Sequence, residues 1–490
     1  MGTEQRALFI IFGGTGGDLA KRKLYPSLFN LYRKGFLNEN FAVIGTARRP
    51  WTDEYFQKVV TDAINSEDAL AEDATQFASH FYYQSHNVND TEHYITLRNL
   101  ADKLDRKYEI GGNRMFYLAM SPRFFGTIAE HLKSQKIVTT EGYNRVIVEK
   151  PFGRDFASAT ELNDAIGRYF PEKDVFRIDH YLGKEMVQNI LAVRFGNNLF
   201  RALWNNRYID NIQITLSEAL GVEERAGYYE TAGALRDMVQ NHILQIVALL
   251  TMNMPASYSE EDIRREKIYA LKSLKKYTPA QVQANFIRAQ YTAANGQRGG
   301  YREEEKIASD SATETFVAGK LFVDNENFSG VPIYVRTGKR LSQKRSRIDI
   351  AFKTMPTNIF APQPLGQNVL TINIEPEGKI FLQINVKQVG QGFTLKKSHL
   401  DFFPTSNGKQ VFPEAYEKLF ADALAGGDAT NFTHWEEVAY SWKFVDAIRT
   451  AWDQHDYALE EYPCGSMGPV AADKLLARDG HKWFYTGQEH

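Results

Sequence analysis

Residues 176–190 read FRIDHYLGKEMVQNI and bring an acid, an imidazole and an ammonium close together. Asp179, His180, Lys184 and Glu185 lie within seven positions of this stretch. Such side chains can bind a metal, transfer a proton or hold an anion, and they also occur in solvated turns. We expect no metal site, because one histidine without a second ligand at metal spacing supports it poorly. Proton transfer and anion binding remain the candidate chemistries.

A second candidate stretch is the glycine-rich segment FIIFGGTGGDLAKRKLYP, residues 9–26. Gly14, Gly17 and Ala20 have the spacing GxxGxxA, which lets a backbone turn tightly beside a pyrophosphate at a helix N-terminus. A flexible turn would explain the glycines but not their place between an apolar run and a helical pattern. The segment therefore predicts a dinucleotide-binding loop.

The end of the second apolar run indicates which dinucleotide binds. An NAD site normally carries Asp or Glu here for the ribose 2′-hydroxyl, whereas FAVIGTARRP ends with Arg48 and Arg49. Two guanidiniums suit a 2′-phosphate, so NADP is the predicted cofactor and NAD use is left open. The alternative is a pair of arginines in a solvated loop.

The elements that must position these residues follow two patterns. In the first 180 residues, short apolar runs alternate with segments of helical spacing, which predicts a Rossmann-type α/β domain with a parallel sheet. The expected strands are 7–12, 41–45, 114–120, 145–150 and 175–179.

After about residue 205 the runs are longer and alternate clearly, which is typical of an α+β domain with a large, mainly antiparallel sheet. Strands are expected at 208–216, 346–353 and 368–388, the last being a hairpin with its turn at EPEG. A run of helices is expected at about 231–290, and the polar stretch 293–312 is expected to be a loose surface excursion. We expect a domain boundary between residues 178 and 179, which gives domains 1–178 and 179–490.

Composition excludes several classes of protein. The 58 basic and 60 acidic residues nearly cancel, so no overall field recruits nucleic acid or an acidic membrane. The apolar run ALFIIF is too short for a signal sequence or a membrane span. A single cysteine, Cys464, suits a reducing compartment. A soluble cytoplasmic protein is expected.

The motifs, taken in order, resemble the glucose-6-phosphate dehydrogenase family. They are GGTGGDLAKRKLYP, EKPFG (149–153), RIDHYLGKE (177–185), GYYETAGALRDMVQNH (227–242), YVRTGKRL (334–341) and GSMGP (465–469). The resemblance covers nearly the whole chain. Within the family, the sequence is similar to the cytoplasmic enzymes of lactic-acid bacteria. It implies oxidation of D-glucose 6-phosphate at C1 to 6-phospho-D-glucono-1,5-lactone with NADP⁺, the first step of the oxidative pentose phosphate pathway. It also implies a homodimer formed through the C-terminal sheet domain.

The resemblance assigns the general base to His242 and its orienting partner to Asp179. From the residues alone, a histidine opening an apolar helix is more often structural. Its polar neighbours Arg236, Asp237, Gln240 and Asn241 favour a functional role. The same resemblance places the substrate phosphate on His180 and Lys184, which share a face if this segment begins a helix. The further substrate residues that it implies are Lys150, Tyr181, Glu218, Asp237, Lys339 and Lys344.

The cofactor residues implied are Gly13, Gly14, Thr15, Gly16, Gly17, Asp18, Leu19, Lys23, Arg48, Arg49, Asn87, Val88 and Lys150. Two positions depart from the family pattern. An extra glycine precedes Asp18, so either Thr15 or Gly16 is the residue beside the pyrophosphate. Asn87 stands where the family tends to carry Asp.

Two other functions remain as alternatives. One is a sugar oxidoreductase of the glucose–fructose oxidoreductase type, which would not need the phosphate-binding motif DHYLGK. The other is a catalytically inactive NADPH-binding sensor, against which the presence of His242 and Asp179 argues. An absorbance assay at about 340 nm with a sugar phosphate distinguishes the sensor from an enzyme.

Overall fold

The computed structural model describes residues 5–64, 71–294, 299–404, 414–426 and 429–487. The chain forms two compact units. Unit 1 consists of Met1–Gly183, Ser259–Glu261 and Pro413–Ala439, and unit 2 of Lys184–Tyr258, Asp262–Phe412 and Tyr440–His490. The chain thus first passes from unit 1 to unit 2 inside the motif DHYLGKE, between Gly183 and Lys184. A domain boundary after residue 178 stays a prediction.

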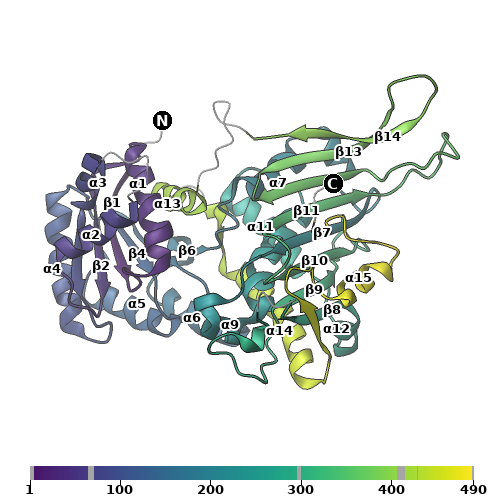
Figure 1. The fold of residues 1–490 in the computed structure, drawn as a ribbon. Coiled ribbons are helices and arrows are strands. Elements are labelled where there is room, and N and C mark those ends of the chain that lie inside the picture. The colour runs from purple at the N-terminus through teal and green to yellow at the C-terminus, as the bar shows by residue number, and fades with distance from the viewer. Residues whose placement is uncertain (1–4, 65–70, 295–298, 405–413, 427–428, 488–490) are drawn as a thin grey trace. The chain divides into compact units, whose positions relative to one another are not determined.

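Unit 1 is built on a seven-stranded sheet in which the chain order reverses beside β1 (Figure 1). Its pairings are parallel except that of β15 with β6. Ala7 to Phe12 of β1 are at most 1% exposed, as expected for a parallel strand covered on both faces. The predicted Rossmann-type architecture is confirmed. In spatial order the strands are β15 (Phe432–Thr433), β6 (Val175–Ile178), β5 (Asn144–Val148), β4 (Arg114–Leu118), β1 (Gln5–Phe12), β2 (Leu37–Ala47) and β3 (Phe81–Ser85).

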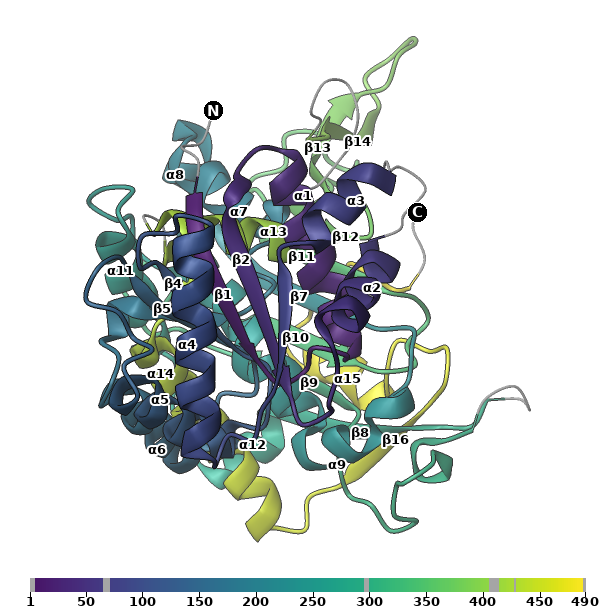
Figure 2. The ribbon, with the colours of Figure 1, turned by 90° about the vertical axis from the view of Figure 1, so that its left-hand side faces the viewer.

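Two groups of helices pack with this sheet (Figures 1 and 2). The first group is α1 (Tyr25–Arg33), α2 (Asp53–Ile64), α3 (Ala71–Ala78) and α13 (Ala415–Ala425). The second is α4 (Thr91–Lys107), α5 (Phe125–Ser134) and α6 (Phe156–Gly167). Right-handed crossovers on the two sides of β1 place the connecting helices on opposite faces of such a sheet. Helix α13 comes from the C-terminal part of the chain, and its Phe420 packs edge-on against Phe9.

Unit 2 is built on a nine-stranded sheet. Neighbouring strands are antiparallel, except that β7 pairs with β10 and β8 with β16 in parallel. The predicted large, mainly antiparallel sheet is confirmed, and so is the hairpin whose arms meet at EPEG. In spatial order the strands are β14 (Leu395–Phe402), β13 (Lys379–Lys387), β12 (Val369–Glu375), β11 (Arg345–Phe352), β7 (Ile209–Ser217), β10 (Ile333–Gly338), β9 (Phe316–Leu321), β8 (Phe286–Thr292) and β16 (Leu459–Pro463).

Several helices pack against this sheet. Helix α7 packs against β12, and the π-helix η5 packs against β7 and β10. Every residue of α10 is buried, which explains why its sequence LQIVALLT is apolar on all sides. Apart from α13, the α-helices and the π-helix that the structure describes from residue 185 onward are α7 (Glu185–Phe195), α8 (Asn198–Leu203), α9 (Ala226–Ala234), η5 (Leu235–Ile243), α10 (Leu244–Thr251), α11 (Glu260–Lys272), α12 (Pro279–Asn285), α14 (Trp435–Gln454) and α15 (Val470–Ala477).

Shorter helices complete the described elements. A π-helical turn, η1 (Ala20–Leu24), precedes α1, and the 3₁₀ turns are Pro122–Phe124, Glu172–Asp174, Glu223–Arg225, Tyr301–Glu303 and Ala429–Asn431. In the part of the chain that the structure describes, none of the helices has both the length and the apolar composition to cross a membrane.

The structure corrects two sequence predictions. The helical run expected to 290 ends at Asn285, because β8 begins at Phe286. The polar stretch 293–312, of which 295–298 lie outside the described residues, is anchored rather than loose. Tyr301 is fully buried, donates a 2.6 Å hydrogen bond to Glu230 and packs edge-on against Tyr291.

Candidate active site

The glycine-rich loop follows β1 at the point where the strand order reverses, which is where open α/β sheets bind ligands. Gly13 and Gly14 have φ angles of 75° and 65°, a region that disfavours side chains. A Cβ atom on Gly14 would lie 2.9 Å from the carbonyl oxygen of Ala119. The Gly17 N–H donates to the Gly14 carbonyl at 2.8 Å and tightens the turn. The loop therefore leaves backbone groups exposed at a helix N-terminus.

Thr15 and Gly16 differ in their solvent exposure. The Thr15 side chain is 1% exposed and lies over Gly45, whereas Gly16 is exposed. A Cβ atom on Gly16 would lie 2.6 Å from the ring of Trp51. The Thr15 carbonyl accepts a 2.6 Å hydrogen bond from Tyr25. Any contact from Thr15 to a bound phosphate would therefore come from its backbone, and which residue makes that contact stays a prediction.

The helix after the loop begins with side chains in exposed ion pairs. Asp18 pairs with Arg22 at 2.8 Å, and Lys23 pairs with Glu414 of the same unit at 2.8 Å. Leu19 is exposed. The Lys23 and Glu414 side chains are 41% and 38% exposed, and a pair this solvated contributes about 0–1 kcal/mol. The Lys23 ammonium could therefore exchange Glu414 for a phosphate at little cost.

Arg48 and Arg49 follow β2, and both side chains are exposed. Their backbone is fixed, because the Arg49 carbonyl accepts from the Tyr83 hydroxyl at 2.8 Å and the Arg48 carbonyl from Ser85 at 3.3 Å. Within the residues that the structure describes, neither guanidinium forms an ion pair. Two uncompensated positive charges on a rigid backbone are suited to a phosphate monoester.

Asn87 and Val88 lie in the loop after β3. The Asn87 N–H donates to Nδ1 of His93 at 2.8 Å, and the Tyr94 hydroxyl donates to the Val88 carbonyl at 2.9 Å. His86 beside them is 3% exposed. Burial, followed by the neighbouring His93, lowers the pKa of His86 to about 4. The buried His86 imidazole beside this loop is therefore uncharged at neutral pH.

Lys150 follows β5 and is half-buried. Its neighbour Glu149 accepts hydrogen bonds from the hydroxyls of Tyr117, at 2.6 Å, and Tyr416, at 3.4 Å. Burial raises the pKa of Glu149. In the sequence, Glu149 stands only as the first residue of the motif EKPFG. The available signal was an acid beside a lysine at the end of a buried strand.

Asp179 is 1% exposed and shapes the turn after β6. Its carboxylate accepts from the Tyr181 N–H at 3.0 Å, and its carbonyl accepts from the Leu182 N–H at 2.9 Å. The His180 and Tyr181 rings lie 5.0 Å apart, and Tyr181 is buried. Because of this turn, α7 begins only at Glu185, with Lys184 as an extended N-cap. The condition under which His180 and Lys184 would share a helical face, namely that this segment begins a helix, is therefore not met.

Lys184 and Lys344 meet at a carboxylate that sequence reasoning missed. The Lys184 ammonium binds Oε1 of Glu375, and Lys344 Nζ lies 3.4 Å from Oε2. Burial raises the pKa of Glu375, but the two ammoniums outweigh it and hold the pKa below its ordinary value. Two predicted substrate lysines thus share one ionised partner.

Glu218 and Lys339 form a 2.6 Å ion pair. Glu218 follows β7 and Lys339 follows β10, and these parallel strands end in register with Ser217 opposite Gly338. The register therefore brings the two side chains together. Lys339 Nζ also lies 5.4 Å from the centre of the Tyr229 ring.

Asp237 and His242 both lie on η5 and are 3% and 1% exposed. A π-helix joins residue i to residue i+5, so these two side chains are about one turn apart. The Tyr228 hydroxyl donates to Asp237 at 3.3 Å. π-helical turns often occur at functional sites, because they place side chains where an α-helix would not. The sequence alone gave no sign that this helix departs from α geometry.

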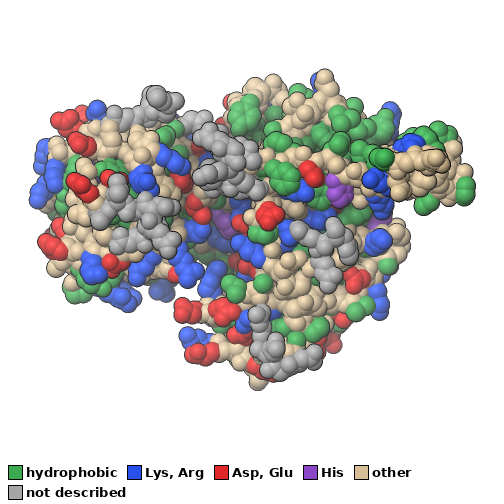
Figure 3. Space-filling view, turned by 45° about the horizontal axis from the view of Figure 1, so that its top comes forward, with side chains coloured by type: hydrophobic (Ala, Val, Ile, Leu, Met, Phe, Trp, Pro, Cys, Tyr) green, Lys and Arg blue, Asp and Glu red, His purple; other side chains and the backbone are tan. Residues whose placement is uncertain are grey.

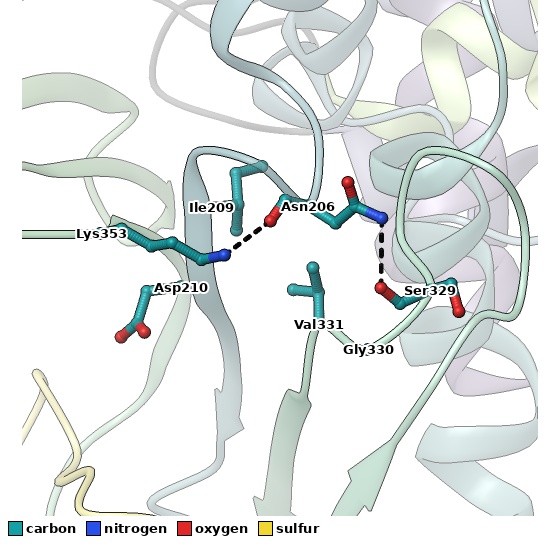
Figure 4. A pocket seen from close by; sticks show the side chains of 7 residues that line it. All are labelled: Asn206, Ile209, Asp210, Ser329, Gly330, Val331 and Lys353. Carbon is teal, nitrogen blue, oxygen red and sulfur yellow. Dashed lines mark hydrogen bonds between the residues drawn. The ribbon is translucent and has the colours of Figure 1, made fainter.

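A cavity of about 330 Å³ elsewhere in unit 2 contains none of the predicted site residues (Figure 4). It is lined by Asn206, Ile209, Asp210, Ser329, Gly330, Val331 and Lys353. Asp210 lies at the start of β7, whereas Glu218 follows its end. A strand of nine residues spans roughly 26 Å, so this cavity is remote from Glu218.

Known proteins match the chain over nearly its whole length. The family described as "Glucose-6-phosphate dehydrogenase, NAD binding domain" matches residues 10–189, and "Glucose-6-phosphate dehydrogenase, C-terminal domain" matches residues 191–484. Glucose-6-phosphate 1-dehydrogenase of Streptococcus pneumoniae is 51% identical over 98% of this chain and 97% of its own length. That of Leuconostoc mesenteroides is 47% identical over 99% of this chain and 100% of its own.

A solved structure gives the same result. Glucose-6-phosphate dehydrogenase in complex with its substrate glucose-6-phosphate superposes with a TM-score of 0.91 and 34% identity, covering 99% of this chain and 100% of that one. The nicotinamide-dinucleotide domain, the mixed sheet domain and the ordered motifs thus agree with one assignment: the chain belongs to the glucose-6-phosphate dehydrogenase family.

Proposed function

We propose that this chain oxidises D-glucose 6-phosphate at C1 to 6-phospho-D-glucono-1,5-lactone and transfers the hydride to NADP⁺, as the first step of the oxidative pentose phosphate pathway. The observation that carries the proposal is the match of both domains to relatives with this activity in their name, at 51% and 47% identity. The oxidoreductase class follows from the family.

The glycine loop fits a bound dinucleotide, since a Cβ atom on Gly14 would collide with Ala119 where the backbone must remain open. The bound nicotinamide supplies the hydride acceptor. NADP is the proposed form, supported by the exposed guanidiniums of Arg48 and Arg49 where an acid would bind a free ribose. NAD is the second acceptor to be tested.

The proposed site residues act either in proton transfer or in binding of the substrate and cofactor. His242 takes the C1 hydroxyl proton as the hydride leaves, and Asp179 orients the imidazole and stabilises its charged form. His180, Lys184 and Lys344 hold the phosphate. The remaining proposed substrate contacts are Glu218, Asp237 and Lys339 with the sugar, and Tyr181 and Lys150, the latter also reaching the cofactor.

We also propose a cytoplasmic homodimer. The single Cys464 suits a reducing compartment. The outer strand β14 exposes Leu400 and Phe402, which are 59% and 52% exposed, and Phe403 follows at 48%. Hydrophobic side chains also gather at the upper right of the space-filling view (Figure 3). Such an apolar edge is typical of an interface, and sedimentation of the purified chain tests the dimer.

Initial rates test the function. The purified chain is given NADP⁺ or NAD⁺ with either glucose or glucose 6-phosphate, and reduced cofactor is followed by absorbance. We expect rapid turnover of glucose 6-phosphate and weak turnover of glucose, with NADP⁺ preferred. Equal turnover of both sugars would favour a sugar oxidoreductase without phosphate recognition, and no turnover would favour the sensor.

A further inference from the structure

Glu375 is the shared partner of two lysines that are proposed to bind the substrate phosphate. The Lys184 ammonium binds Oε1, and Lys344 Nζ lies 3.4 Å from Oε2. Each carboxylate oxygen therefore has its own ammonium. A phosphate group offers these lysines the same kind of acceptor, namely anionic oxygens that take charge-assisted hydrogen bonds.

The backbone fixes this arrangement. Glu375 ends β12 and lies opposite Ser346 at the start of β11, two residues after Lys344. Lys184 is the N-cap of α7, which packs against β12. The carboxylate thus comes from the sheet on which both lysines depend for their position, and it reaches them without a mobile loop.

The environment makes the contact stronger than a surface ion pair. The side chains of Lys184 and Glu375 are 15% and 24% exposed, whereas Lys344 is 64% exposed. Charges that are largely removed from water interact more strongly than solvated ones. An incoming phosphate must therefore displace the Glu375 carboxylate from Lys184.

We propose that Glu375 is an internal competitor for the phosphate group, which occupies the ammoniums of Lys184 and Lys344 until a phosphate ester displaces it. The proposal rests on the proposed function, in which these lysines hold the substrate phosphate. Free phosphate brings only its own charge to the exchange, whereas glucose 6-phosphate adds sugar contacts with residues such as Glu218 and Asp237. Because the exchange costs the same for any phosphate, Glu375 lowers the affinity of the site for inorganic phosphate and for glucose 6-phosphate by the same factor, and the sugar contacts alone favour the substrate.

The variant Glu375→Gln tests this, because the amide keeps the shape of the side chain and removes its charge. Two quantities are measured: the competitive inhibition constant of inorganic phosphate against glucose 6-phosphate, and the dissociation constant of inorganic phosphate by calorimetry without sugar. We expect both to fall by about ten-fold, the change that follows from removing one competing charge-assisted contact. KM for glucose 6-phosphate, where it reflects binding, should fall by a similar factor, and kcat should change little.

Asp401→Asn is the matched control. It removes a carboxylate from strand β14 of the same sheet, where Asp401 pairs with Lys379 at 3.4 Å, and so makes the same change in net charge. Its phosphate constants should equal those of the wild type. If Glu375→Gln does not fold, Glu375→Asp shortens the side chain by one methylene, and the same fall, smaller in size, is expected.

Two results would overturn the proposal. Phosphate constants that rise in Glu375→Gln would mean that the carboxylate holds the lysines in their binding geometry, and unchanged constants would mean that it does not compete. Failure of the wild type to oxidise glucose 6-phosphate would instead count against the proposed function. Calorimetry with inorganic phosphate separates the two, because it needs no turnover.

Discussion

Oε1 of Glu314 accepts a hydrogen bond from the backbone N–H of Leu235 at 3.1 Å. Leu235 opens η5, the helix that carries Asp237 and His242, and its N–H is one of the donors that a helix leaves unpaired at its start. Glu314 is fully buried, and its other oxygen lies 3.3 Å from Arg449 Nη1. A carboxylate at a helix N-terminus also interacts favourably with the helix dipole. Glu314 is therefore a positioning residue for the proposed base.

Removing this carboxylate should loosen the helix. Glu314→Ala leaves a buried N–H and part of a buried arginine without an acceptor, so we expect a loss of about 2–4 kcal/mol in the free energy of unfolding. Glu314→Gln keeps an acceptor for Leu235 and should lose less. Urea unfolding measures both, and kcat should follow the same order while the NADP⁺ dissociation constant stays constant. Two variants of equal stability would contradict the role of the hydrogen bond.

The sequence predicts β1, β2, β4, β5 and β6 of the first sheet but only β7, β11, β12 and β13 of the second, and solvent exposure explains part of the difference. A strand such as β1 is covered on both faces and reads as an apolar run, but β14 is LKKSHLDF and mostly exposed, so it has no apolar pattern. The edge strand β16, LEEYP, has the same difficulty and ends in proline.

The candidate site divides in the same way. Residues within a motif, such as Asp179 and Lys184, can be named from the chain, although the turn made by Asp179 moves the start of α7. Glu375 is separated from Lys184 by 191 positions, and Glu314 from Leu235 by 79. Neither acid stands out in sequence, because only the register of the sheet and the helix packing bring it to its partner.

Cofactor preference tests the two arginines after β2. Replacing Arg48 and Arg49 with Ala should weaken NADP⁺ by about 1–3 kcal/mol, because charge-assisted contacts to the 2′-phosphate are lost. NAD⁺ kinetics should stay the same or improve. The control is Arg154→Ala, an exposed arginine of the same unit outside the proposed site. Equal weakening of both cofactors would show that the arginines do not read the 2′-phosphate.

Lys184→Ala tests the phosphate grip. The change removes an ammonium and leaves the Glu375 charge less compensated beside the phosphate, so KM for glucose 6-phosphate should rise by about ten-fold or more. Activity on free glucose should barely move. Lys379→Ala removes a lysine of the same sheet that pairs with Asp401, and it should leave both sugars unaffected. Equal losses on glucose and glucose 6-phosphate would remove the phosphate assignment.

His86 makes the stability of unit 1 depend on pH. Its pKa is lowered to about 4 chiefly by burial, while an unfolded histidine titrates near 6.5. Between these values the unfolded chain binds more protons, so stability falls as pH decreases from about 6.5 toward 4. His86→Gln should flatten this dependence in urea unfolding, whereas the exposed His399→Gln should not. Parallel pH profiles in wild type and His86→Gln would contradict the assignment.

The proposed base gives the sharpest test of the mechanism. Hydride cannot leave C1 cleanly unless the hydroxyl proton also leaves, so a base must lie within hydrogen-bond reach of that hydroxyl. Asparagine at position 242 keeps some hydrogen bonding but cannot accept the proton. We therefore expect His242→Asn to lower kcat by about 10²–10⁴-fold, the usual contribution of a general base.

The same variant should leave binding nearly intact, because the phosphate is held by other residues, so KM for glucose 6-phosphate should stay within about a few-fold of wild type. Asp179→Asn should lower kcat by less, since an orienting carboxylate does not itself take the proton. Its carboxylate also accepts the Tyr181 N–H at 3.0 Å, and the amide oxygen of asparagine can keep that bond. A loss of kcat in Asp179→Asn with unchanged thermal stability would therefore be chemical rather than structural. If His242→Asn keeps more than about a tenth of wild-type kcat, the proton leaves by another route.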